Sequence, residues 1–112
     1  MRVLLSSPLR ADVFRRFLPD DLEASVETLD DRTEDGLVDA APGADVLVAD
    51  WLFQVPISAR VVDQLDVCRL IQQPSAGFQL IDLTAAASRG IPVANAPGNA
   101  VAVAFPVSPF FT

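Results

Sequence analysis

Three observations on the 112-residue sequence predict an α/β protein. Short apolar runs recur along the chain, and segments with apolar residues at helical spacing separate them. Pro, Gly, Asn, Asp or Ser residues punctuate the boundaries. Alternation of this kind is typical of a parallel sheet whose crossover helices cover both faces. The length suits a single domain.

The first four elements follow from local pattern. Arg2–Leu5 is a run of Val and Leu that ends at a Ser-Ser-Pro turn, and it predicts a strand. Ala11–Phe17 has apolar residues at helical spacing and stops before a proline, which predicts a short helix. Ala24–Leu29 alternates with acids and predicts a second strand. Thr33 precedes two acids and a periodic apolar pattern, so it is the predicted cap of a helix that ends at Pro42-Gly43.

The next five elements continue the alternation. Asp45–Ala49 contains an unbroken apolar run, typical of a strand covered on both faces. Ser58–Leu65 predicts a helix capped by its serine, and Arg69–Gln72 predicts a fourth strand. Leu83–Ser88 is Ala-rich, with an aspartate before it and a glycine two residues after it, and predicts a fourth helix. Ile91–Ala94 predicts the last strand.

Five strands and four helices in this order match a flavodoxin-like, doubly wound parallel sheet. In such sheets ligands bind beyond the carboxyl ends of the strands, which nominates the loops Ser6–Leu9, Asp50–Val55 and Gln73–Gln79. Small residues in Ser75-Ala76-Gly77 let a ligand approach the backbone, whose N–H groups can cradle a carboxylate or phosphate. A plain turn between strand and helix explains the same residues.

Composition narrows the chemistry. The net charge is −7, every base is Arg, and the chain has no Lys, His or Tyr and one Cys. These values argue against nucleic acid or an anionic membrane as a partner. They also leave no His-based general base, no His or Cys metal site and no internal disulfide. Without a signal peptide or an uninterrupted apolar span, we expect a cytoplasmic chain.

Several single residues have two interpretations. Asp50 and the pair Asp30-Asp31 follow apolar strands, as in receiver domains that bind Mg²⁺, but those domains also need a Lys. Asp50 is therefore interpreted as a loop or cap residue. Cys68 is interpreted as a packed core thiol. Trp51 and Phe53 either line a pocket or cover the end of the sheet, and Asn99 either caps a helix or orients a ligand.

From Ala44 onward the sequence resembles the D-isomer-specific 2-hydroxyacid dehydrogenases, in the N-terminal part of their catalytic, substrate-binding domain. The resemblance lies in Ala44–Val48, Leu70–Asp82 and Ala85–Ala104. Its specific features are the small-residue loop, the Ile-Asp…Ala-Ala…Arg-Gly-Ile segment and the Asn-Ala-Pro-Gly-Asn segment. Residues 1–43 agree only in pattern. The resemblance thus assigns residues 1–104 to that domain and leaves 105–112 as an unrelated apolar tail.

Members of this family exchange a hydride between NAD or NADP and the pair of a 2-keto acid and a D-2-hydroxy acid. The resemblance implies that backbone N–H groups at Ser75, Ala76 and Gly77 bind the substrate carboxylate. It implies that Asn99 lies near the ligand at an interdomain hinge and that Val103 lies beside the nicotinamide. The partner it implies is a small 2-keto or 2-hydroxy acid.

The sequence also departs from the family. Gln79 stands where members commonly carry Asp or Asn, and Phe105, followed by prolines, stands where they open a long helix with Glu. We expect a fragment without the nucleotide-binding domain and without catalytic Arg, Glu and His residues, produced by a shifted frame or early stop. Such a chain would bind no cofactor alone, be inactive and self-associate through exposed apolar surface. A non-enzymatic domain that binds small carboxylates or docks on a partner is the alternative, as is one half of a split enzyme.

Overall fold

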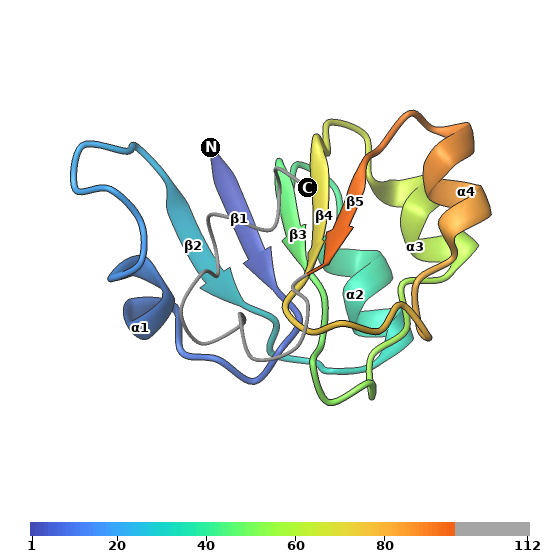
Figure 1. The fold of residues 1–112 in the computed structure, drawn as a ribbon, viewed down its shortest axis with the longest axis horizontal. Helices are drawn as coiled ribbons and strands as arrows, with labels where there is room; N and C mark the ends of the chain where they lie inside the picture. The colour runs from blue at the N-terminus through green and yellow to red at the C-terminus, as the bar shows by residue number, and fades with distance from the viewer. Residues whose placement is uncertain (96–112) are drawn as a thin grey trace.

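The computed structural model describes residues 1–95, which form one twisted sheet with helices packed on it (Figure 1). The strands of this part are β1 (Arg2–Leu5), β2 (Ser25–Thr28), β3 (Val46–Val48), β4 (Leu70–Gln73) and β5 (Val93–Asn95). The helices between them are α1 (Ala11–Arg15), α2 (Glu34–Ala40), α3 (Ala59–Gln64) and α4 (Leu83–Ser88). Every predicted element is present, and the boundaries differ by one or two residues, as helix and strand ends commonly do.

Side-chain caps begin three of the four helices. Thr33 Oγ1 accepts the Gly36 N–H at 3.0 Å, and Ser58 Oγ accepts the Val61 N–H at 3.4 Å. The carboxylate that precedes α4 accepts the Ala85 N–H at 2.9 Å. Each cap satisfies one backbone donor that has no partner within the helix. Helices this short are not stable alone, so packing on the sheet holds them.

The five strands are all parallel and lie in the order β2-β1-β3-β4-β5. Val3 is paired with Val46, and Ile71 is paired with Val93. This order belongs to flavodoxin-like doubly wound sheets and confirms the predicted fold class. The chain reverses its direction of travel across the sheet after β2, when it returns past β1 to form β3.

Helices cover the two faces unequally. Leu37 of α2, Val61 of α3 and Ala86 of α4 pack with Leu47 and Ile71 in the larger core cluster. The opposite face carries α1, whose Phe14 packs with β1 and β3 in a smaller cluster. Fully buried Val, Leu and Ile side chains at the sheet–helix contacts supply the main driving force for this arrangement.

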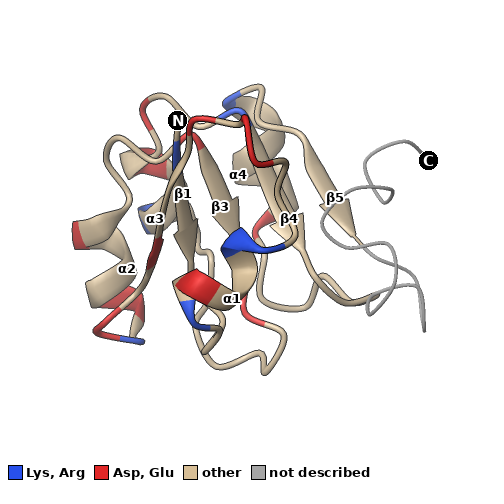
Figure 2. Cartoon of the chain, turned by 90° about the vertical axis from the view of Figure 1, so that its left-hand side faces the viewer, with Lys and Arg blue, Asp and Glu red and all other residues tan. Residues whose placement is uncertain are grey.

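Charge is distributed unevenly along the sheet (Figure 2). Residues 1–50 hold 12 of the 15 acids, and Figure 2 shows β5 as an uncoloured strand without charged residues. Exposed apolar side chains occur in the second half of the sequence at Leu52, Val67 and Leu83. Among the helices of residues 1–95, none is long and apolar enough to cross a membrane.

Candidate functional site

The candidate site lies at the carboxyl edge of the sheet, where the loops after β1, β3 and β4 leave neighbouring strands. Backbone hydrogen bonds continue between these strands beyond their ends. Ser6 N donates to Val48 O at 2.9 Å, and Ala49 N donates to Gln72 O at 2.8 Å. The three loops nominated by the sequence therefore start side by side.

The loop after β1 is closed by its own hydrogen bonds. Ser6 and Ser7 are fully buried, and their hydroxyls donate to Val48 O and Ala49 O, each at 2.7 Å. Ser7 Oγ also accepts the Trp51 N–H at 3.0 Å. Both hydroxyls therefore tie β1 to β3 and are not available to a ligand.

Asp50 organises the loop after β3. Its side chain is fully buried. Oδ1 accepts the Leu52 N–H at 3.0 Å, and Oδ2 accepts the N–H groups of Gln54 and Val55 at 3.0 and 3.2 Å. Arg32 Nη2 completes the set at 2.6 Å from Oδ2. The carboxylate thus acts as the loop residue that the sequence predicts, with an ion pair that the sequence did not reveal.

Arg32 connects this loop to the other segments at the edge. Its Nε donates to Ser6 O at 3.2 Å and its Nη1 to Gln54 Oε1 at 3.2 Å, in addition to the bond with Asp50. Wrapping around the carboxylate also turns Phe53 into the left-handed region, with φ 55°. A non-glycine residue in that region costs free energy, which the surrounding hydrogen bonds must offset.

The loop after β4 is arranged differently. Gln73 Nε2 donates to Ser75 Oγ at 2.8 Å, and Asn95 Nδ2 donates to Ala76 O at 2.8 Å. These bonds fix the loop through its side-chain and carbonyl oxygens. Within residues 1–95, the backbone N–H groups of Ser75, Ala76 and Gly77 donate no hydrogen bond. Ala76 is exposed, so these donors are open to a ligand or to water.

Gln79 lies over the glycine of this loop. A Cβ added to Gly77 would come within 2.0 Å of Gln79 Oε1 and 2.8 Å of its Cδ. The amide at this position, where the resembled family commonly has Asp or Asn, therefore borders the N–H groups of the candidate carboxylate cradle. Its side chain is exposed and long enough to move aside.

The structure brings together three of the five predicted site residues, Ser75, Ala76 and Gly77. Asn99 and Val103 lie outside the described residues. Asn95 is a site residue to which the sequence reasoning gave no role. The available signal was its place at the carboxyl end of β5, beside β4.

Other reactive groups lie apart from this edge or are already engaged. Cys68 packs against the larger core cluster and donates its thiol to Leu70 O at 3.3 Å. Burial raises the pKa of this thiol, which disfavours the reactive thiolate. In the part of the chain that the structure describes, no three His, Cys, Asp or Glu side chains group as a metal site would require.

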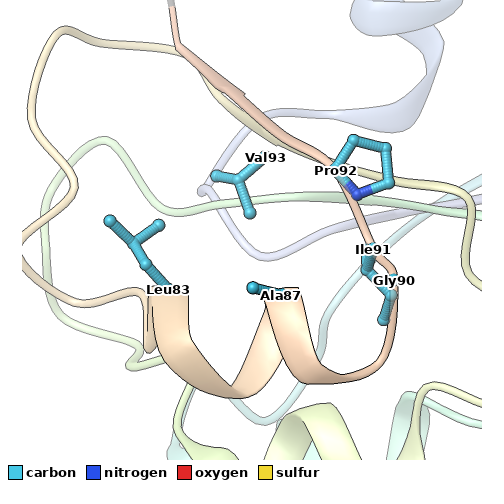
Figure 3. A pocket seen from close by; sticks show the side chains of 6 residues that line it. All are labelled: Leu83, Ala87, Gly90, Ile91, Pro92 and Val93. Atoms are coloured by element: carbon cyan, nitrogen blue, oxygen red, sulfur yellow. The ribbon is translucent and has the colours of Figure 1, made fainter.

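An apolar cavity of about 520 Å³ lies between α4 and β5 (Figure 3). Its lining residues carry no charge and no polar side chain: Leu83, Ala87, Gly90, Ile91, Pro92 and Val93. An organic acid would find no side-chain partner for its carboxylate there. The cavity therefore does not compete with the loop after β4 as the candidate acid site.

The described residues do not fit a dinucleotide cofactor. A pyrophosphate cradle in a doubly wound sheet needs a glycine-rich turn after the first strand. Here that turn begins Ser6-Ser7-Pro8, both serines are buried, and both hydroxyls are bonded to β3. The acid-binding loop is the ligand feature that this part of the chain offers.

Comparison with known proteins gives a consistent match. Residues 3–104 match the family model described as "D-isomer specific 2-hydroxyacid dehydrogenase, catalytic domain". A D-3-phosphoglycerate dehydrogenase of Archaeoglobus fulgidus is 30% identical over 99 residues, which cover 88% of this chain and 18% of that protein. The chain thus spans less than a fifth of this curated relative.

Solved structures share the fold. The NAD⁺-bound 3-phosphoglycerate dehydrogenase of Entamoeba histolytica aligns with a TM-score of 0.71 and 18% identity, over 87% of this chain and 33% of that one. D-lactate dehydrogenase of Escherichia coli aligns with a TM-score of 0.68 and 20% identity, over 88% of this chain and 31% of that one. The family match extends over nearly the whole chain, and the fold agrees with it. The chain belongs to the D-isomer-specific 2-hydroxyacid dehydrogenases, and it corresponds to part of their catalytic domain.

Proposed function

We propose that this chain forms the acid-binding part of an oxidoreductase acting on the CH–OH group of D-2-hydroxy acids. In this proposal the loop Ser75–Gly77 holds the substrate carboxylate. The observation that carries it is the set of consecutive backbone N–H groups without a protein partner, at the sheet edge where ligands of such folds bind. Family membership supplies the chemical class of the substrate.

Each loop residue then has a defined task. The N–H groups of Ala76 and Gly77 donate to the carboxylate, and hydrogen bonds to a charged acceptor are the stronger kind. Gln73 and Asn95 hold the loop through Ser75 Oγ and Ala76 O, so the donors stay oriented without being consumed. Orientation of this kind lowers the entropy lost when the substrate binds.

The proposal assigns binding and orientation to this chain. In the family a nicotinamide cofactor supplies the hydride when bound. The sequence has no His, so the proton transferred to the C2 oxygen must come from another group. We therefore expect the purified chain to bind acids without oxidising NADH.

A titration of the purified chain with D-lactate, followed by amide NMR, tests the carboxylate site. We expect saturable shifts at Ser75, Ala76 and Gly77. Gly77→Pro removes one N–H donor and should weaken binding about tenfold or more. Gly77→Ala is the matched control, because it keeps the N–H and its Cβ meets only the movable end of the Gln79 side chain. Absence of binding at millimolar D-lactate, or equal binding by both variants, contradicts the proposal.

The same loop also suits a non-enzymatic domain that captures small carboxylates. This second candidate shares the open N–H groups and differs in the fate of the acid. Adding NADH together with glyoxylate to the purified chain, and following absorbance at the nicotinamide band, separates turnover from binding alone. Turnover by this chain would contradict the assignment of binding only.

A further inference from the structure

We propose that Trp51, Leu52 and Phe53 form an apolar wall beside the carboxylate loop and select acids with an apolar side chain over phosphorylated acids. This inference rests on the proposed function of Ser75–Gly77. It adds the substrate class, which the chain's own residues determine.

The wall and the carboxylate loop are tied together at both ends. At the start, Ala49 N donates to Gln72 O at 2.8 Å. At the end, Ile57 N donates to Leu80 O at 2.7 Å, and Ile57 and Ile81 form a parallel bridge. Figure 1 shows both loops beyond the arrowheads of β3 and β4. A ligand held by one loop therefore lies next to the other.

The wall is exposed and held in place. Leu52 is 48% exposed, and Trp51 and Phe53 are half-buried. Asp50 fixes their backbone through three N–H groups, and Phe53 is held in a left-handed conformation. Keeping three consecutive apolar side chains partly in water costs free energy, which an apolar ligand group covering them would recover.

Charge at this edge argues against a phosphate. The Arg side chains that follow the edge loops within residues 1–95 are already paired: Arg10 with Asp12, Arg32 with Asp50, and Arg60 with Glu34 and Asp35. The sequence has no Lys, and its net charge is −7. A phosphate dianion would have to break one of these ion pairs, whereas an apolar substituent has no such cost.

Binding of three D-2-hydroxy acids tests the proposal: D-2-hydroxyisocaproate, D-lactate and D-3-phosphoglycerate. Trp51 is the sole Trp of the chain, so its fluorescence reports ligand at the wall directly. We expect D-2-hydroxyisocaproate to bind about tenfold more tightly than D-lactate and to produce the larger change in Trp51 emission. D-3-phosphoglycerate should bind most weakly.

Leu52→Ser provides a second measurement, made by calorimetry. Leu52 is exposed, so this variant should fold, and its preference for D-2-hydroxyisocaproate over D-lactate should fall to about threefold or less. Val67→Ser is the matched control. Val67 is 49% exposed and lies just before β4, at the opposite edge of the sheet, so the preference should not change.

The outcomes separate the two proposals. Tightest binding of D-3-phosphoglycerate, equal binding of all three acids, or an unchanged preference in Leu52→Ser overturns the apolar wall and leaves the carboxylate loop standing. Failure of all three acids to bind overturns the carboxylate loop and the wall with it.

Discussion

The loops after β3 and β4 are neighbours at one edge of the sheet but use their hydrogen-bonding groups in opposite ways. The loop after β3 turns its N–H groups inward onto Asp50, a side chain with no exposed surface. The loop after β4 is held by Gln73 and Asn95 and leaves its N–H groups open. One loop is a support with its donors satisfied, and the other is a receptor with donors to spare.

This difference separates stability from binding within one edge. Buried polar groups must be paired, so a residue that pairs several of them at once is expensive to lose. An exposed N–H that bonds only to water costs the fold little when it is removed. Substitutions in the first loop should therefore act on folding, and substitutions in the second loop should act on ligand affinity.

The strongest test of this contrast is Asp50→Ala. The change leaves three backbone N–H groups and the Arg32 guanidinium without their acceptor. We expect a loss of about 3–5 kcal/mol in the free energy of unfolding, measured with urea. Asp30→Ala is the control, since Asp30 is exposed, and it should change stability by less than about 0.5 kcal/mol. Similar stabilities for the two variants would show that the loop does not depend on the buried carboxylate.

A smaller effect should separate the backbone of Phe53 from its side chain. Both Phe53→Ala and Phe53→Gly remove the ring, but only glycine adopts φ 55° without steric cost. Phe53→Gly should therefore be more stable than Phe53→Ala by about 1 kcal/mol, the reverse of the usual order of these residues. Thermal unfolding of the pair provides the measurement. The usual order, with alanine the more stable, would indicate that the loop relaxes when the ring is lost.

The smallest effect is expected at the opposite edge of the sheet, at Asp66. The Gly43 N–H bonds to Asp66 Oδ1 at 2.9 Å and lowers the pKa of this carboxyl below its usual value. A lowered pKa in the folded state stabilises the fold above the unfolded-state pKa of about 4, and this contribution is lost as pH falls through the lower value. The Tm difference between wild type and Asp66→Asn should therefore be present at neutral pH and shrink in acid. Asp63→Asn, on the neighbouring helix, is the control. A Tm difference that stays constant with pH would contradict the hydrogen bond to Gly43.

The sequence predicted the elements and their order well, because most of the signals are local. Helix caps at Thr33 and Ser58 depend on residues three positions away, and the strand runs are contiguous. The edge loops also followed, since parallel strands present their carboxyl ends together. The Arg32–Asp50 pair and the Asn95–Ala76 bond could not be predicted this way. Their partners are 18 and 19 residues apart and meet only after the crossovers have formed.

The place of β1 in the sheet has a consequence for how the chain is made. The first strand to leave the ribosome lies in the interior of the sheet, between β2 and β3. Val3 must wait for Val26 on one side and for Val46 on the other, so much of its pairing is long-range in sequence. Such pairing is slow, and the nascent apolar strand stays unprotected while more than forty further residues are translated. A bulky fusion at Met1 would be attached directly to this interior strand, whose start at Arg2 already bonds to Asp45.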